Sequence, residues 1–227
     1  MNKEHIRYHY GVEQRSSEWF DLKCGRFSAS EIYKLCGVRG LGQTGETYIF
    51  DKVAEILTGK VREIPTTFAM QHGIDTEPVV KAIYESNTGV EVKEPAFVTN
   101  KRFSRCGVSP DGIVEADNFI VLESYGIEIK CPESQSQYAK YLTIKTAEDL
   151  KRIKPEYYWQ IQFCMLITEV KEWRFITYHS DFKNLSMIEI PVYWNTTDID
   201  FLDERIKQAN LMLDSKLEQI KNNWMKK

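Results

Sequence analysis

Two short segments carry the residue types best suited to catalysis: residues 109–112, Ser-Pro-Asp-Gly, and residues 127–132, Ile-Glu-Ile-Lys-Cys-Pro. Alternate side chains of a β-strand project from the same face, so Glu128 and Lys130 are expected about 6–7 Å apart. Ile129 points the opposite way, into the core. Asp111 belongs to a turn before a neighbouring strand, and a hairpin could bring it alongside Glu128. We therefore predict two carboxylates and one ammonium on one surface.

This combination suits the hydrolysis of a phosphodiester. Phosphate ester hydrolysis needs among the largest rate enhancements known, whereas a single general base typically supplies only about 10²–10⁴-fold. Two carboxylates can bind Mg²⁺, which neutralises phosphate charge and lowers the pKa of a bound water. A lysine beside them can orient that water or stabilise the charge that develops on phosphorus.

The short pattern has a plainer interpretation as well. Acid-x-Lys recurs at residues 91–93 and 169–171, where a solvated surface pair is the simpler explanation. Pro-Asp-Gly is also a common turn sequence, and strands can carry exposed charges. Only residues 128–130 combine the pattern with an apolar strand, a following proline and an upstream Pro-Asp-Gly turn. These segments alone leave both interpretations open.

Four segments, in order, resemble the PD-(D/E)XK nucleases, specifically the phage lambda exonuclease and YqaJ-type viral recombinase family. Residues 107–114 (GVSPDGIV) and 126–132 (GIEIKCP) are similar to the family's active-site signature. Upstream, residues 19–30 (WFDLKCGRFSAS) are similar to its segment W-x-x-x-R-x-G-x-x-T-A-S, and residues 73–77 match its G-x-x-x-E helix. Downstream, residues 158–162 match its glutamine-bearing helix. The similarity runs from about Trp19 to Thr168.

The resemblance implies a two-metal site. Asp111 would bridge two Mg²⁺ ions, for which Mn²⁺ would substitute. Glu128 and the carbonyl of Ile129 would hold one ion, and Glu77 the other. Lys130 would act on the attacking water.

The resemblance also implies contacts to a DNA end. Ser30, Ser109 and Gln160 would bind the 5′-terminal phosphate. The family's arginine in that pocket is Lys23 here, which keeps the charge but loses the bidentate fork, and Arg26 is a candidate to compensate. Met70 falls where the family places an apolar wedge that separates the terminal base pair.

The implied activity is a Mg²⁺-dependent 5′→3′ exonuclease on linear double-stranded DNA. It would leave a 3′ single strand for a single-strand annealing recombination protein. The resemblance further implies a homotrimeric ring and a phage or prophage origin. Two alternatives stay open: an endonuclease or repair nuclease on the same fold, and a catalytically silent DNA-end-binding protein. The presence of Asp111, Glu128 and Lys130 argues against the silent alternative.

The elements that must position these residues follow from hydrophobic periodicity and turn residues. Helices are expected over residues 17–26, 28–36, 42–60, 74–89, 154–169 and about 198–224, and strands over residues 90–100, 111–116, 118–124, 125–132, 172–180 and 187–194. Pro78 is expected in the first turn of its helix, where proline is tolerated. This order predicts an α/β (α+β) fold with one central mixed sheet flanked by helices, which the resemblance identifies as a restriction-endonuclease-like PD-(D/E)XK core.

Length and composition set the remaining limits. At 227 residues the chain can form a single nuclease domain, with N-terminal helices over 16–60, a catalytic core over about 66–195 and a C-terminal helix over about 198–224. The net charge of −3 requires any DNA binding to use a local basic patch. Five scattered cysteines without a C-x-x-C pair disfavour a zinc ribbon or a disulfide framework. No long apolar run or signal core is present, so a cytoplasmic protein without a membrane partner is expected.

Overall fold

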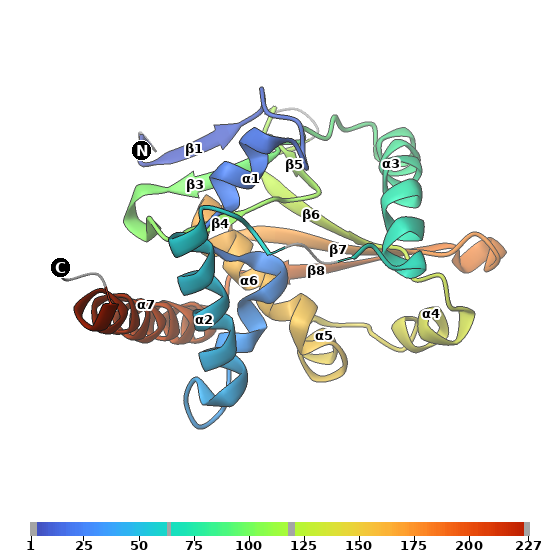
Figure 1. The fold of residues 1–227 in the computed structure, drawn as a ribbon. Helices are drawn as coiled ribbons and strands as arrows, with labels where there is room; N and C mark the ends of the chain where they lie inside the picture. Colours follow the sequence, from blue (N-terminus) through green and yellow to red (C-terminus); the bar gives the residue numbers. More distant parts are fainter. Residues whose placement is uncertain (1–3, 63–64, 118–120, 225–227) are drawn as a thin grey trace.

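The computed structural model describes residues 4–62, 65–117 and 121–224, and its strands form two mixed four-stranded sheets with helices around them (Figure 1). The first sheet has the order β1-β3-β4-β2, with β1 (Ile6–His9), β3 (Phe97–Asn100), β4 (Cys106–Val108) and β2 (Phe27–Ser28). The second has the order β5-β6-β7-β8, with β5 (Gly112–Val114), β6 (Tyr125–Lys130), β7 (Glu172–Tyr178) and β8 (Met187–Tyr193). The mixed α/β class expected from the sequence is confirmed.

The division into two sheets differs from the single sheet expected. β4 leads into β5 through residues 109–111, where Pro110 has no N–H to continue a ladder. Beyond this turn, an isolated antiparallel bridge joins Lys93 to Ile113 of β5. The chain therefore changes sheets at the turn that carries Asp111.

The helix α6 (Pro155–Thr168) forms the centre of the molecule. Its residues from Tyr158 onward are nearly all buried, as expected for a helix that is apolar all round. Together with α4 (Gln135–Tyr141) and α5 (Ala147–Ile153), it makes the crossover between the parallel strands β6 and β7. The face of β6 that carries Glu128 lies on the α6 side, because Gln160 of α6 bonds to that carboxylate.

The opposite face of β6 packs against α3 (Phe68–Thr88). Tyr125, Ile127 and Ile129 join Val80 and Tyr84 in one apolar cluster. The predicted helix start at residue 74 was wrong, because the Thr67 side chain caps the helix by accepting from the N–H of Met70 at 3.2 Å. Pro78 consequently lies inside the helix rather than in its first turn. It is exposed, so water can replace the missing N–H donor.

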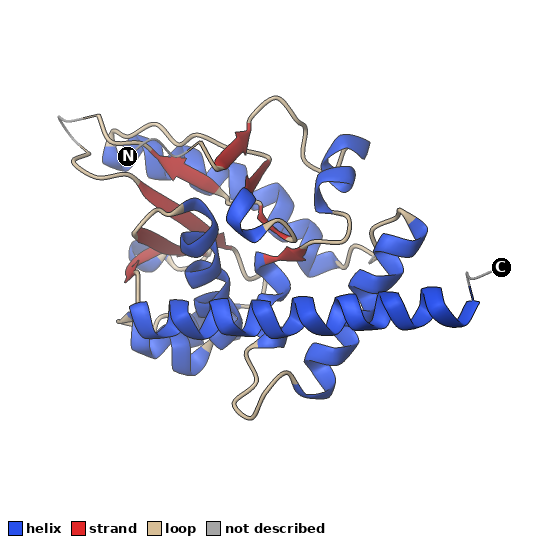
Figure 2. Ribbon diagram, turned by 90° about the vertical axis from the view of Figure 1, so that its left-hand side faces the viewer, coloured by secondary structure: helices blue, strands red, loops and turns tan. Residues whose placement is uncertain are grey.

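The remaining helices lie outside the β6–β7 crossover and α3. They are α1 (Ser17–Lys23), α2 (Gly42–Thr58), α7 (Thr196–Trp224) and the short 3₁₀ helices η1 (Ala29–Leu35), η2 (Lys101–Phe103) and η3 (Lys183–Leu185). Figure 2 shows α7 as a long helix along one side of the molecule. Its buried stripe runs from Ile199 to Leu217. No helix in the described ranges combines the length and the apolar character needed to cross a bilayer.

Several predicted boundaries need correction. The predicted α-helix 28–36 is a 3₁₀ helix over residues 29–35, and only residues 97–100 of the predicted strand 90–100 lie in a named strand. In the predicted strand 118–124, residues 118–120 lie outside the described residues, and Val121–Ser124 adopt a loop. The strands β1, β2 and β4 and the helices α4 and α5 were not predicted from the sequence. These elements are short, so hydrophobic periodicity has few residues on which to act.

Candidate active site

The β5–β6 hairpin brings Asp111, Glu128 and Lys130 together. Gly112 pairs with Ile127 in the antiparallel register, so the residue before Gly112 lies beside the C-terminal half of β6. The Asp111 carboxylate accepts from the N–H of Ile129 at 2.6 Å. The Lys130 ammonium donates to Glu128 Oε1. The two predicted carboxylates and the ammonium therefore lie together, although Glu128 is buried rather than on a surface.

Glu128 is completely buried at the centre of this cluster. Its Oε1 accepts from Gln160 Nε2 at 2.6 Å, in addition to Lys130. Its Oε2 has no hydrogen-bond partner among the described residues. Burial, followed by the charge of Asp111, raises the pKa of Glu128 to about 8. A buried carboxylate oxygen without a partner is unfavourable, so this atom fits a cation ligand.

Glu77 of α3 is the third carboxylate of the site. Burial and then the charge of Asp111 raise the pKa of Glu77 to about 7, whereas Lys130 opposes the shift. Burial also raises the pKa of Asp111, against the opposing effects of Lys130 and the Ile129 N–H. The charge of Asp111 thus raises the pKa of both glutamates, and the charge of Glu77 adds to the raised pKa of Glu128.

These residues fit a hard divalent cation by the chemistry of their donors. Mg²⁺ prefers carboxylate and carbonyl oxygens, and the cluster supplies three carboxylates and the Ile129 carbonyl. Across the described ranges, no three acidic, histidine or cysteine side chains are gathered into a closed metal cage. Lys130 and Gln160 instead hold Glu128 Oε1, and the Ile129 N–H holds Asp111.

Lys130 is held as a cation. Burial alone would lower its pKa, but the charges of Glu128 and Asp111 outweigh burial and raise the pKa of Lys130 above its ordinary value. Its ammonium lies 5.3 Å from the ring centroid of Tyr157. The Thr177 hydroxyl donates to the Lys130 carbonyl at 2.8 Å. Lys130 is therefore suited to electrostatic stabilisation rather than to accepting a proton.

A second ion pair, missed by the sequence analysis, ties α3 to the turn of Asp111. Lys81, one turn after Glu77, is buried and lies 2.5 Å from Glu94. Glu94 follows Lys93, whose backbone pairs with Ile113 in both directions at 2.8 and 2.9 Å. The spacing of Glu77 and Lys81, four residues apart on one helix, was the available signal.

The same segment touches the turn directly. A Cβ atom on Gly112 would lie only 2.2 Å from Cγ1 of Val92. The N–H of Val92 donates to Glu85 of α3 at 2.8 Å. Two contacts of α3 thus fix the segment that packs on the Asp111–Gly112 turn.

A pocket of about 670 Å³ opens beside the cluster. Glu77, Ile129 and Lys130 line its inner wall, and Ser30 and Met70 also line it. The structure therefore brings the predicted Ser30 and Met70 to the same pocket as Lys130 and Glu77, whereas Asp111 and Glu128 are not among its lining residues. Met70 is 46% exposed.

Four further predicted residues are not among those that line this pocket. Gln160 instead contacts Glu128, as described above. The Ser109 hydroxyl donates to the Ala96 carbonyl at 2.7 Å and accepts from the indole N–H of Trp19 at 3.1 Å. It therefore braces the turn that precedes Asp111.

The two predicted phosphate-binding cations are also turned elsewhere. Lys23 lies 4.7 Å over the Trp19 ring and lines a separate small cavity with Lys52 and Glu55. Burial, and then the charge of Lys52, lowers the pKa of Lys23. Arg26 donates from Nη1 to the Leu22 carbonyl at 2.6 Å.

The pocket contains residues that sequence reasoning missed. Tyr157, Tyr141 and Gln137 form one wall, joined by hydrogen bonds of 3.3 Å between the two hydroxyls and 2.8 Å from the Gln137 amide to Tyr141. Arg15, from the loop before α1, also lines the pocket. Tyr157 precedes Gln160 by one helical turn and could have been inferred from that spacing. Arg15 has no such signal.

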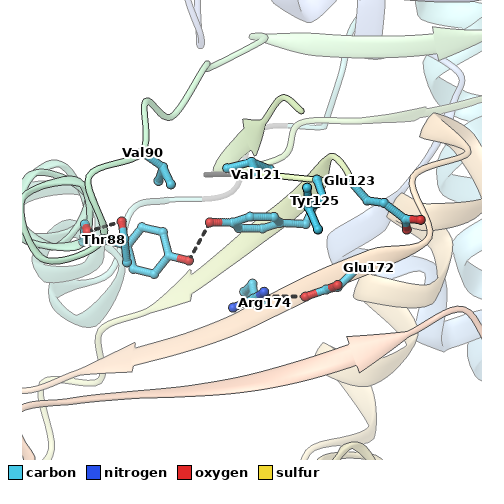
Figure 3. Close-up of a pocket in the computed structure, with 9 residues that line it drawn as sticks. Thr88, Val90, Val121, Glu123, Tyr125, Glu172 and Arg174 are labelled. Carbon is cyan, nitrogen blue, oxygen red and sulfur yellow. Dashed lines mark hydrogen bonds and ion pairs between the residues drawn. The ribbon is translucent and has the colours of Figure 1, made fainter. Parts of the chain in front are cut away.

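A second pocket, of about 480 Å³, lies at the other end of β6 and β7 (Figure 3). The hydroxyls of Tyr84 and Tyr125 are 3.0 Å apart there. Arg174 is already paired with Glu172 at 2.6 Å and with Glu189. Because its guanidinium is paired with two carboxylates, this pocket is a poorer candidate for a phosphate site than the pocket that Arg15 and Lys130 line.

Solved structures share this fold. The alkaline exonuclease LHK-Exo from Laribacter hongkongensis, crystallised in complex with dAMP, is 25% identical, with a TM-score of 0.78 over 92% of this chain and 97% of that chain. A phage related exonuclease from Haemophilus somnus 129PT is 15% identical, with a TM-score of 0.62 over 86% of this chain and 96% of that chain, and shows likeness of fold alone.

Sequence comparison gives the family. Among curated proteins, none matches the chain. Residues 18–171 match the YqaJ-like viral recombinase domain, and this span includes Glu77, Asp111, Glu128, Lys130 and Gln160. More than half of the chain is covered by that match, and the chain therefore belongs to the YqaJ-like viral recombinase domain family.

Proposed function

We propose that the chain is a metal-dependent 5′→3′ exonuclease that degrades linear double-stranded DNA and leaves a 3′ single strand. The observation that carries the proposal is the convergence of Asp111, Glu128 and Lys130 at the end of the β5–β6 hairpin, with Glu77 facing them from α3. Membership of the YqaJ-like family and the likeness to alkaline exonucleases support a phage-type exonuclease.

In this proposal Asp111, Glu128, Glu77 and the Ile129 carbonyl hold Mg²⁺, or Mn²⁺ in its place. Bound metal would supply neutralisation of the phosphate charge and a water of lowered pKa. The chain's own residues position the substrate and stabilise charge. The Lys130 ammonium faces the pocket and stabilises the negative charge that develops on phosphorus. Gln160 and Lys130 together keep Glu128 Oε1 oriented, which leaves Oε2 for the cation.

Met70 and Ser30 extend the proposal to the DNA end. An exposed methionine on the first turn of α3 is suited to stack against, or to separate, a terminal base pair. The Ser30 hydroxyl lines the same pocket and can donate to a phosphate oxygen. We further propose that the product strand is passed to a single-strand annealing recombination protein, and that the enzyme acts as a homotrimeric ring in a phage context.

The reaction and its polarity are tested with linear duplex DNA labelled at the 5′ or the 3′ end of each strand, in Mg²⁺. Early loss of the 5′ label, with the 3′ label retained on a shortening duplex, is expected. Covalently closed plasmid is the control and should stay intact. Equal cutting of closed and linear DNA would assign the site to an endonuclease, and early loss of the 3′ label would reverse the polarity.

A further inference from the structure

The strongest unexplained feature of the pocket is Arg15, which has a left-handed backbone conformation with φ of 68°. Among the described residues, the other non-glycine positions with positive φ are Glu169 and Lys183. Glu169 ends α6, where a left-handed residue is common. Arg15 precedes a helix, so this explanation does not apply to it. Strained non-glycine residues are concentrated at functional sites.

The neighbouring backbone fixes this conformation. The N–H of Ser16 donates to the Glu13 carbonyl at 3.1 Å, which closes a turn around Arg15. The Ser16 hydroxyl accepts from the N–H of Trp19 at 3.2 Å and caps α1. Glycine would adopt the same conformation without strain. The side chain at position 15 therefore needs an explanation other than folding of the turn.

The side chain supplies a cation to the pocket. The lining residues include two basic side chains, Arg15 and Lys130, and Lys130 is already bonded to Glu128. Arg15 is exposed, and it forms no ion pair within the described part of the chain. Its charge is the smallest of the contributions that lower the pKa of Lys23, and Lys23 itself lines a separate cavity. Arg15 is therefore available to bind an anion in this pocket.

We propose that Arg15 binds a DNA phosphate at the mouth of the pocket, in the place that the sequence analysis gave to Lys23 or Arg26. This inference rests on the proposed function for the identity of the ligand as DNA. Arg15 and Ser30 would contact one phosphate from two sides, because a guanidinium binds phosphate oxygens through two parallel N–H groups. The phosphate is either the 5′-terminal group or an internal backbone phosphodiester.

The test is Arg15→Gly, because glycine removes the guanidinium and keeps the left-handed backbone. Thermal unfolding of this variant should match the wild type, so that lost binding cannot be attributed to lost folding. Arg102→Ala is the matched control, since Arg102 is an exposed arginine paired with Glu169 outside the pocket. Arg15→Lys keeps the charge without the fork and should retain part of the affinity.

Binding is measured without divalent metal, so that the DNA stays intact. Fluorescence anisotropy compares linear duplexes with 5′-phosphate and 5′-hydroxyl ends over a series of salt concentrations. Arg15→Gly should weaken binding about tenfold, as expected for one charge-assisted contact. The magnitude of the slope of log affinity against log salt concentration should fall by about one, as expected for the loss of one phosphate contact.

The two duplexes separate the possible sources of the phosphate. A loss confined to the 5′-phosphorylated duplex assigns Arg15 to the terminal phosphate, and an equal loss on both assigns it to the backbone. Affinity and salt slope equal to those of Arg102→Ala on both duplexes would overturn the proposal. A wild type that binds DNA through Arg15 but cuts none would instead overturn the proposed nuclease function alone.

Discussion

At the scale of single residues, the pKa of Glu128 links the site to stability. Burial, with a smaller contribution from Asp111, raises this pKa to about 8 in the folded chain, whereas an unfolded glutamate titrates near about 4.3. Between these values the folded chain binds more protons than the unfolded chain. The free energy of unfolding therefore falls as pH rises through this window.

Glu128→Gln should remove much of this pH dependence, because an amide stays neutral at every pH. Thermal unfolding of metal-free protein between about pH 5 and pH 8 measures the effect. Glu133→Gln, an exposed acid on the loop after β6, is the control. Mg²⁺ should stabilise the wild type more at high pH than at low pH, since the cation binds the ionised carboxylates. If the unfolding temperatures of wild type and Glu128→Gln changed in parallel with pH, the raised pKa of Glu128 would be contradicted.

At the scale of elements, the placement of Glu77 depends on how α3 attaches to the turn of Asp111. The Lys81–Glu94 pair makes this attachment, with side-chain exposures of 8% and 55%. Lys81→Met should lower the free energy of unfolding by about 1 kcal/mol. The effect is small because Glu94 is half exposed, so water screens part of the attraction between the two charges. The substitution should also weaken metal binding, since Glu77 loses its fixed distance to Asp111.

Urea unfolding and calorimetric titration with Mn²⁺ measure these two effects. Glu115→Gln is the control, because it breaks the comparably short but exposed Lys93–Glu115 pair on the same segment. That variant should leave both quantities close to the wild type. A Lys81→Met protein with wild-type Mn²⁺ affinity would show that the pair is structural only.

The elements also show what sequence can and cannot predict. Long periodic segments such as α2, α6 and α7 were predicted because many residues support one period. The β5–β6 hairpin was predicted from Pro-Asp-Gly and the alternation in residues 125–130. The start of α3 was missed, because its first turn packs no buried residue against the core and depends on the cap by Thr67. The short strands β1, β2 and β4 are defined by pairing with distant partners, which local patterns do not encode.

The same limit applies to the site. Glu128 and Lys130 share a strand, so their proximity follows from a period of two. Arg15 reaches the pocket through a left-handed turn, and Lys81 contacts Glu94 across a loop; neither contact follows from local spacing. Lys23 and Arg26 were assigned from the resemblance to a family motif, but each contacts the residue four positions earlier, the Trp19 ring and the Leu22 carbonyl.

At the scale of the whole molecule, the proposed DNA contacts depend on local basic residues and not on the net charge. Its net charge is −3, yet Arg15 and Lys130 line one pocket. The likeness to LHK-Exo covers 92% of this chain, so the candidate site is placed on an exonuclease fold rather than on an isolated motif. The assignment of residues 1–227 to a single nuclease domain stays a prediction.

The central claim is that Asp111, Glu128, Glu77 and Lys130 form one metal-dependent site for phosphodiester hydrolysis. The most direct measurement is the Mg²⁺-dependent release of nucleotides from linear duplex DNA by the wild type and by Asp111→Asn, with thermal unfolding as the check on folding. If the four residues form this site, we expect degradation by the wild type and a loss of about 10²-fold or more in a folded Asp111→Asn variant. Undiminished release by the folded variant would contradict it.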